Sequence, residues 1–203
     1  ARRAAEADRA RRLAQLAASE KAQSIIKSCR LITHPYLVVK GFQDERGLVT
    51  EDGELIIPMR DCETGRVLGA QRIVLVENEW EKKMLFGMRA KGASYRIGSA
   101  RAAELWFVEG YATGLSVDAA LKLLRLSAAV VVCFSASNLV YVASRLAGRR
   151  FVFADNDASG AGERAAWDTG LPYAMAPTTG QDANDLHMAA GVMAVAKKIM
   201  EAR

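Results

Sequence analysis

The second half of the chain alternates short, continuously apolar segments with helix-forming segments, and this alternation limits the folds available to it. The apolar segments cover residues 105–108, 129–134, 151–154 and 173–175. The helix-forming segments that follow them cover residues 115–124, 139–146, 161–167 and 186–202. Strands without polar alternation are buried on both faces, and their repetition with helices is typical of a mostly parallel sheet between helical layers. We therefore predict an α/β domain over residues 101–203.

The first half follows a different pattern. Residues 3–30 are rich in Ala, Arg, Glu and Lys, so the segment 1–30 is predicted to be an N-terminal helix. Beyond it, turn signals at Asp52-Gly53 and Thr64-Gly65 separate short apolar segments, which cover residues 37–39, 55–59, 67–76 and 84–86. This spacing predicts a small antiparallel sheet, and we expect residues 31–100 to form a basic, β-rich α+β lobe.

Charge, cysteine content and hydropathy limit the partners and the cellular location expected for the chain. Its 203 residues carry a formal net charge of +5, a mild preference for an anionic partner. Cys29, Cys62 and Cys133 are odd in number and lack zinc-ligand spacing, which favours reduced thiols and a cytoplasmic location. No apolar run approaches the roughly 20 residues of a membrane span, so no membrane association is expected. Because the chain begins at Ala1, we expect it to be a piece of a longer protein.

Acidic residues follow three of the predicted strands. Glu109 follows the first, Asp155 and Asp157 the third, and Asp182 and Asp185 the fourth. The carboxyl ends of strands in an open α/β sheet meet in the crevice where ligands bind. If the third strand stays extended, the carboxylates of Asp155 and Asp157 leave on the same face. Oxygen ligands of this kind suit Mg²⁺, which binds through one or two carboxylates together with substrate phosphates.

Other interpretations of these acids remain open. An EF-hand loop starting at Asp155 would need Glu at its twelfth position, where the chain has Ala166, so that reading is excluded. A turn rich in Asp and Gly explains the pair 155–157 alone, and helix capping is a competing role for Asp185. The glycines at 160 and 162 would leave helix amides open to an anion, unless Ser159 caps them.

Three segments resemble the motifs of the Toprim domain. They read Glu109-Gly110-Tyr111-Ala112-Thr113-Gly114-Leu115-Ser116, Asp155-Asn156-Asp157-Ala158-Ser159-Gly160, and Asp182-Ala183-Asn184-Asp185-Leu186. Upstream, residues 57–61, 65–72 and 82–86 are similar to the basic lobe that precedes Toprim in DnaG-type primases. The match spans about residues 34–190, and the segments around Glu109 and Asp185 look closest to primases of plasmids and phages.

The resemblance implies a role for each acid. Glu109 would be a metal ligand or the acid/base that manages the proton of the attacking 3′-hydroxyl. Asp155 and Asp157 would hold Mg²⁺ or Mn²⁺, and Asp182 and Asp185 would assist a second metal. The basic residues that would contact the template backbone or nucleoside triphosphates are Arg60, Arg72 and Lys83, with Arg66, Lys82 and Lys91 as further candidates.

The activity implied is that of a nucleotidyltransferase: metal-dependent, template-directed synthesis of short RNA primers on single-stranded DNA. The implied partners are the DNA template, nucleoside triphosphates and a helicase or other replication protein. Replication primases usually have Asp four residues after the motif Glu, where this chain has Thr113. Two alternatives therefore stay open, namely strand cleavage of the Toprim nuclease or topoisomerase kind, and a non-catalytic nucleic-acid-binding module of a larger protein.

Overall fold

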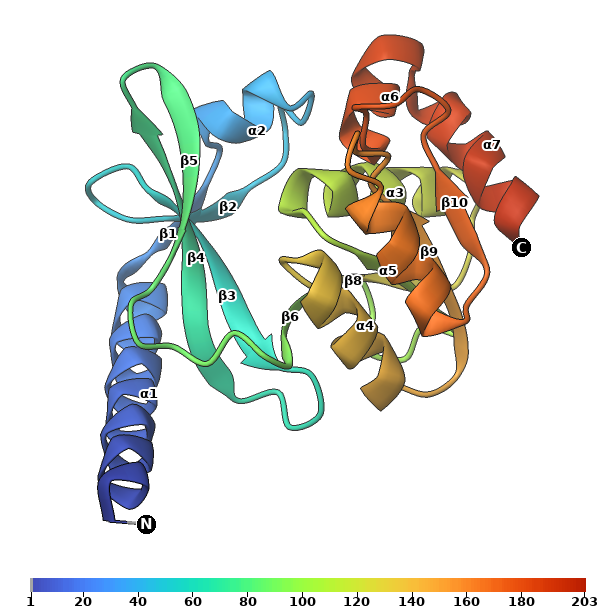
Figure 1. Cartoon of the computed structure of the whole chain (residues 1–203). Coiled ribbons are helices and arrows are strands. Elements are labelled where there is room, and N and C mark those ends of the chain that lie inside the picture. Colours follow the sequence, from blue (N-terminus) through green and yellow to red (C-terminus); the bar gives the residue numbers. More distant parts are fainter. Residues whose placement is uncertain (1) are drawn as a thin grey trace. The chain divides into compact units, whose positions relative to one another are not determined.

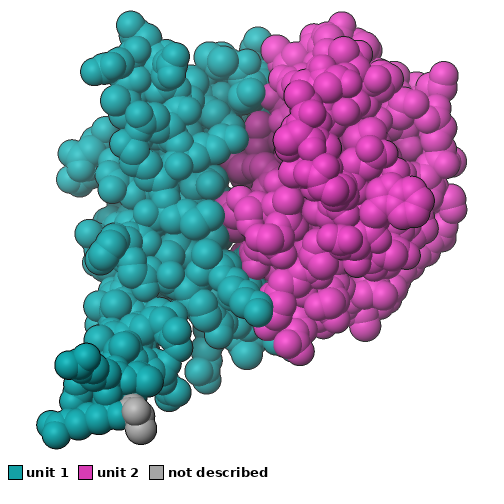
Figure 2. All heavy atoms as spheres, viewed as in Figure 1, with its two compact units in different colours: residues 1–93 teal, residues 94–203 magenta. Residues whose placement is uncertain are grey.

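The computed structural model describes residues 2–203 of the chain, which fold into two compact units. Unit 1 covers residues 1–93 and unit 2 covers residues 94–203 (Figure 2). The division falls a few residues before the lobe boundary expected from the sequence, and the N-terminal helix belongs to unit 1. Within residues 2–203, every helix is too short or too polar to cross a bilayer.

Unit 1 is an antiparallel sheet with one long helix and one short helix (Figure 1). Its elements are α1 (Arg2–Ser28), β1 (Arg30–Ile32), α2 (Pro35–Val39), β2 (Gly47–Val49), β3 (Leu55–Asp61), β4 (Val67–Val76) and β5 (Glu79–Met84). Neighbours in sequence are neighbours in the sheet, because β1 to β5 pair in chain order and always antiparallel. This confirms the hairpin architecture predicted from the turn signals.

Helix α1 packs on this sheet through small side chains. Ala22 is fully buried against Ile56, Ala70 and Leu85, so the helix backbone approaches β3 and β4 closely. The hydroxyl of Ser19 also donates a 2.6 Å hydrogen bond to the carbonyl oxygen of Val67 in β4. Most of the remaining helix surface is exposed.

Two of the predicted strands in this unit were wrong. Residues 37–39 belong to α2, because Pro35 occupies the first helical turn and the His34 ring accepts the amide of Tyr36 at 3.1 Å as an N-cap. Residues 84–86 lie mostly beyond a strand, since β5 ends at Met84 and Phe86 is 99% exposed. In both places a local cap or turn outweighed the apolar composition on which the prediction rested.

Unit 2 is a mixed, mostly parallel sheet flanked by helices, as predicted. Its elements are β6 (Ala93–Ile97), β7 (Glu104–Val108), α3 (Tyr111–Leu123), β8 (Ala128–Val132), α4 (Ala136–Arg145), β9 (Arg149–Ala154), α5 (Ala161–Thr169), β10 (Tyr173–Met175), α6 (Ala183–Ala190) and α7 (Val192–Ala202). The strand order is β6-β8-β7-β9-β10, in which only β6 runs antiparallel to its neighbour. Helices α3, α6 and α7 pack together, as do α4 and α5.

The core of unit 2 explains the apolar strands seen in the sequence. Trp106 and Phe151 stack at 4.8 Å between ring centroids and are almost fully buried, together with Phe153. The predicted final helix, however, is two helices, α6 and α7, separated at Gly191. Gly191 has φ of +80°, a conformation that ends one helix and redirects the chain into the next.

Candidate active site

The acidic motifs lie at one end of the parallel strands of unit 2. Glu109 comes directly after β7 and Asp155 directly after β9, and these two strands are paired in parallel. Their carboxyl ends therefore meet at the same edge of the sheet. The topology that the strand pattern predicted thus brings the first two motifs together.

Glu109 has a carboxyl group whose ionised form is disfavoured. Burial raises the pKa of Glu109, and the negative charge of Asp157 raises it further, while a hydrogen bond from the backbone amide of Ala136 lowers it in part. Glu109 and Asp157 follow the paired parallel strands β7 and β9, so both lie at the same edge of the sheet. The Glu109 backbone oxygen also accepts the amide of Phe134 at 2.8 Å, which ties the end of β7 to the chain after β8.

Asp157 has the opposite character. Hydrogen bonds from the Ser159 side chain and from the amide of Gly162, with further ones from the amides of Ala161 and Ser159, hold its pKa well below the ordinary value against a small effect of burial. The amide contacts measure 2.8 Å from Gly162, 2.9 Å from Ser159 and 3.2 Å from Ala161. The amides at the start of α5 are therefore satisfied by Asp157, whose carboxylate stays ionised.

Asp155 lies at the point where β9 ends and α5 passes closely. A Cβ on Gly162 would lie 2.3 Å from the backbone oxygen of Asp155, so only glycine allows this approach. The extended pairing of β9 stops at Ala154, and Asn156 forms an isolated bridge with Gln181. Through this bridge the second acidic motif is hydrogen bonded to the loop that carries the third.

Asp182 and Asp185 form the capping box of α6. The Asp182 carboxylate accepts the amides of Asn184 at 2.7 Å and Asp185 at 2.9 Å, and Asp185 accepts the amide of Asp182 at 3.1 Å. The remaining oxygen of Asp182 accepts a 2.9 Å hydrogen bond from Thr113 in α3. The capping role weighed for Asp185 is thus present, and Asp182 shares it.

A buried polar cluster behind this cap was missed from the sequence. Ser116, which is fully buried in α3, lies 3.1 Å from the ring Nδ1 of His187 and accepts the side-chain amide of Asn184 at 3.1 Å. Burial lowers the pKa of His187. Ser116 stands one helical turn after Thr113, so the same face of α3 meets α6 twice; that i, i+3 pair of hydroxyls was the available signal.

The donor set fits a divalent cation held jointly with a substrate. Among residues 2–203, no group of three or more His, Cys, Asp and Glu side chains is arranged to enclose a metal ion. Glu109 and Asp157 nevertheless lie at the same edge of the sheet, and burial, together with the negative charge of Asp157, raises the pKa of Glu109. Mg²⁺ commonly binds through one or two carboxylates and completes its shell with water and phosphate oxygens.

The basic candidates of unit 1 fall into two groups. Arg72 on β4 forms a two-pronged ion pair with Glu54, which raises the pKa of Arg72, and Lys83 on β5 pairs with Glu81. Arg72 and Lys83 are directly opposite each other in the sheet. Arg72 is half-buried and already neutralised, which distinguishes it from the exposed arginines of the β3–β4 turn.

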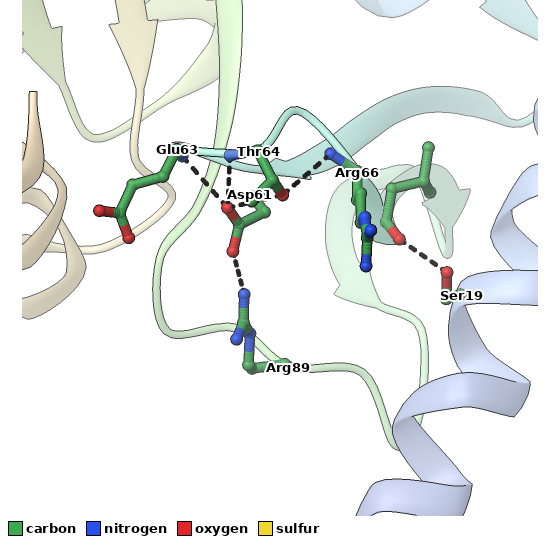
Figure 3. A network of polar contacts seen from close by, with 7 residues as sticks. Ser19, Asp61, Glu63, Thr64, Arg66 and Arg89 are labelled. Atoms are coloured by element: carbon green, nitrogen blue, oxygen red, sulfur yellow. Dashed lines mark hydrogen bonds and ion pairs between the residues drawn. The ribbon is translucent and has the colours of Figure 1, made fainter.

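Those exposed arginines are Arg60 and Arg66. Arg60 donates a 3.2 Å hydrogen bond to the carbonyl oxygen of Gly65, and Arg66 extends from the turn that Figure 3 shows. Lys82 and Lys91 are also exposed, on β5 and in the loop before β6. The six basic candidates therefore all lie on unit 1, but at different places on its sheet and turns.

Comparison with known proteins places this geometry in a family. A Toprim-domain family model matches residues 104–192, the segment that contains all three acidic motifs. No curated protein sequence matches the chain. Among solved structures, the DnaG catalytic core matches with a TM-score of 0.51 and 20% identity over 90% of this chain, which spans 60% of that structure's length.

Two further structures match less closely. The RNA polymerase domain of Mycobacterium tuberculosis primase DnaG has a TM-score of 0.46 and 19% identity, with 91% of this chain and 71% of that chain covered. The bacteriophage T7 structure of a lagging-strand DNA polymerase with primase domains of two gp4 subunits, an RNA/DNA hybrid and dTTP has a TM-score of 0.48 and 17% identity, with 73% and 75% covered. Residues 104–192 are thus a Toprim domain, in a chain that shares its fold with the catalytic core of DnaG primase.

Proposed function

We propose that this chain is the catalytic core of a primase, which joins nucleoside triphosphates into short RNA primers on a single-stranded DNA template. The observation that carries the proposal is the position of Glu109 and Asp157 just beyond the carboxyl ends of the paired parallel strands β7 and β9, where the pKa of Glu109 is raised and that of Asp157 is lowered. Such a separation is the usual sign of one group suited to proton transfer and one that stays ionised. The Toprim match and the shared DnaG fold support the same reaction class.

The roles follow from these environments. Glu109, with its raised pKa, is the group suited to accept the proton of the attacking 3′-hydroxyl. Asp157 and Asp155, with Glu109, would hold Mg²⁺ or Mn²⁺ through carboxylate oxygens. The chemistry that the bound cation supplies is neutralisation of the triphosphate charge during in-line displacement of pyrophosphate.

The third motif has a supporting role in this proposal. Asp182 and Asp185 cap α6, and Asp182 is linked to α3 through Thr113. If Asp182 and Asp185 also assist a second metal ion, they do so in addition to capping α6. On unit 1, Arg60, Arg66, Lys82 and Lys91 are exposed and would contact template or triphosphate, while Arg72 and Lys83 would do so from within their ion pairs.

The test is primer synthesis by purified protein with single-stranded DNA, nucleoside triphosphates and Mg²⁺ or Mn²⁺. We expect metal-dependent, template-dependent products from the wild type and none from Asp155→Ala or Glu109→Gln. Asp168→Asn is a matched control, because Asp168 is an exposed acid on α5 outside the motifs. Unchanged synthesis by Asp155→Ala would refute the assignment, and cleavage of labelled DNA without triphosphates would point to a nuclease instead.

One observation favours a second function, that of a non-catalytic nucleic-acid-binding module. Within the described residues 2–203 no three-acid cluster is arranged for a metal, and Asp182 is already occupied by Thr113 and the α6 amides. A binding module would bind single-stranded DNA without any dependence on divalent metal and would yield no product. Measuring DNA affinity with Mg²⁺ and with a chelator, alongside synthesis, separates the two functions.

A further inference from the structure

A groove on unit 1 runs between helix α1 and the β3–β4 turn. Its volume is about 730 Å³. On the helix side its lining extends from Arg12 to Gln23, a length of about 16 Å at about 1.5 Å rise per residue. On the other side lie the turn residues from Arg60 to Leu68, and Arg89 completes the lining.

The two walls are fixed relative to each other. Ser19 in α1 donates its 2.6 Å hydrogen bond to Val67 at the start of β4, directly within the lining (Figure 3). Ala22, three residues after Ser19 in α1, is fully buried against the sheet. A Cβ on Gly69 would lie 2.4 Å from the Met88 sulfur, so the segment bearing Arg89 also packs tightly on β4. The groove is therefore a preformed feature of the unit.

Asp61 is the single acid in the lining, and its carboxylate is bound by groups of the β3–β4 turn and by Arg89. Asp61 accepts the amides of Glu63 at 3.1 Å and Thr64 at 2.8 Å, and it forms an ion pair with Arg89 (Figure 3). Partial burial raises the pKa of Asp61, but these hydrogen bonds and Arg89 outweigh that effect and leave it lowered. Asp61 thus stays ionised, orders the turn and balances one arginine.

The other arginines leave the groove positive. Arg12, Arg60 and Arg66 are exposed, and Arg12 has an ion pair with Asp8, one helical turn away and outside the lining. Among residues 2–203, no carboxylate pairs with the guanidinium of Arg60 or Arg66. With four arginines against one ionised aspartate, the lining carries a net charge of about +3 at neutral pH, and the positive charge persists at higher pH because arginine does not deprotonate.

The remaining lining residues suit a chain rather than a single ion. Gln15 and Gln23 offer amide donors and acceptors along the helix, and Leu16, Val67 and Leu68 provide apolar surface between the charges. The lining contains no aromatic side chain on which a base could stack. Such a groove holds phosphates through guanidinium groups and does not read base identity.

We propose that this groove binds the phosphate backbone of single-stranded nucleic acid without sequence preference, with α1 as an essential wall. The inference deepens the proposed function by assigning a place where template would be held, although the groove requires no catalysis to work. It adds Arg12 on α1 and Arg89 to the expected contacts and gives Arg60 and Arg66 a shared site.

The test compares the affinity of the whole chain for a labelled, mixed-sequence single-stranded DNA by fluorescence anisotropy at several salt concentrations. Arg12→Gln/Arg66→Gln removes two charges from the groove. Arg9→Gln/Arg46→Gln removes two exposed charges of unit 1 outside the lining and is the matched control. Circular dichroism and thermal melting verify that both variants fold like the wild type.

We expect the groove variant to lose about tenfold or more in affinity at moderate salt, and its plot of log K against log salt to become shallower by roughly 1.4, at about 0.7 per phosphate contact. The control should remain within about twofold. Equal losses in both variants, or no loss in the groove variant, would overturn the proposal, since net charge alone would then explain binding. Displacement of the DNA by nucleoside triphosphate at low concentration would instead assign the groove to triphosphate and also overturn it.

A second measurement needs no variant. Ultraviolet cross-linking of wild-type protein to DNA that contains a photoreactive base should label peptides from residues 12–23 and 60–68; labelling confined to other peptides would contradict the proposal. Asp155→Ala keeps the groove intact, so it should bind DNA like the wild type even where it makes no primer. Failure of primer synthesis with retained groove binding would thus refute only the catalytic proposal.

Discussion

The hydroxyl of Thr113 donates a 2.9 Å hydrogen bond to the carboxylate of Asp182, 69 residues further along the chain. The bond joins α3, which follows the first acidic motif, to the N-terminus of α6, which carries the third. Thr113 is buried, and the other oxygen of Asp182 accepts two amides of α6. Thr113 is the position, four residues after Glu109, where the resemblance to replication primases implies an acid, and a carboxylate there would face the carboxylate of Asp182.

Removal of the Thr113 hydroxyl should destabilise the fold. Thr113→Val keeps the side-chain shape but withdraws the donor, and loss of a buried hydrogen bond to a charged group costs about 1.5–3 kcal/mol. Thr113→Ser keeps the hydroxyl and is the control. Urea unfolding measures the free energy of unfolding of both variants, and equal stability of Thr113→Val and wild type would contradict the role assigned to this bond.

Replacement by an acid should make stability depend on metal. Thr113→Asp places a second carboxylate against Asp182, so the melting temperature should fall in the presence of a chelator. Addition of Mg²⁺ or Mn²⁺ should recover more of it in this variant than it adds to the wild type, because a cation relieves the repulsion. Differential scanning fluorimetry with and without metal is the measurement, and a metal response no larger than that of the wild type would argue against a cation at this position.

Glu109→Gln should raise thermal stability in metal-free buffer while it abolishes primer synthesis. Burial and the charge of Asp157 raise the pKa of Glu109, so the folded state disfavours its ionised form. Wild-type stability therefore falls as pH rises from the ordinary glutamate pKa, about 4.3, to the raised value, and stays lowered above it. The stability of Glu109→Gln should not fall in this pH range on account of residue 109, because glutamine does not ionise.

Melting curves of the wild type and Glu109→Gln between acidic and neutral pH test this predicted direction of the stability change. The variant should exceed the wild type at neutral pH, and the difference should shrink towards acid. Mn²⁺ should raise the melting temperature of the wild type more than that of the variant. A variant less stable than the wild type at neutral pH without metal would show that ionised Glu109 is favourable in the fold.

Gly162→Ala should destabilise unit 2 and disturb Asp157. The added Cβ would lie 2.3 Å from the Asp155 backbone oxygen, so α5 must shift away from β9. The amide of Gly162 also donates to Asp157, so the shift would weaken that carboxylate's hydrogen bonds. We expect a loss of about 1–3 kcal/mol, as for overpacked sites, and reduced primer synthesis.

Gly170→Ala at the other end of α5 is the matched control for Gly162→Ala. No atom lies within 4 Å of its Cβ, and its φ of +65° limits the cost to backbone strain of about 1–2 kcal/mol. Synthesis by the folded control should be unchanged. A Gly162→Ala protein as active as this control would contradict the positioning role of the close contact.

Ser116→Ala should destabilise the packing of α3 on α6. The fully buried hydroxyl of Ser116 accepts the side-chain amide of Asn184 and lies 3.1 Å from His187. Its removal withdraws two hydrogen bonds from a site that water reaches poorly, at a cost of about 1–3 kcal/mol. Ser144→Ala, at an exposed serine of α4, should change the free energy of unfolding little in the same urea titration.

Much of unit 2 could be predicted from the sequence because its signals are local. Strands buried on both faces read as continuous apolar segments, and the acids that follow them lie at the carboxyl edge of a parallel sheet whatever the details of packing. The prediction of one helix over 186–202 was wrong, since the apolar periodicity continues across Gly191 and only the positive φ of this glycine in the structure reveals the break. The strand predicted over residues 37–39 was wrong for a related reason. Pro35 and the His34 cap favour a helix there, which three apolar residues alone do not indicate.

Strand and helix periods and chain polarity depend on neighbouring residues, so the α/β class, the hairpin sheet of unit 1 and the order of the acidic motifs after the strands could be read from the amino acids alone. The environment of each acid depends on packing between distant segments: Asp157 accepts amides at the start of α5, Asp182 accepts the hydroxyl of Thr113, and the pKa of Glu109 is raised. The same packing places Arg12 and Arg66, 54 positions apart in the numbering, in the lining of one groove. Hydrogen bonds and electrostatic fields act across short distances in space, and those distances are set by packing between segments that sequence spacing does not relate.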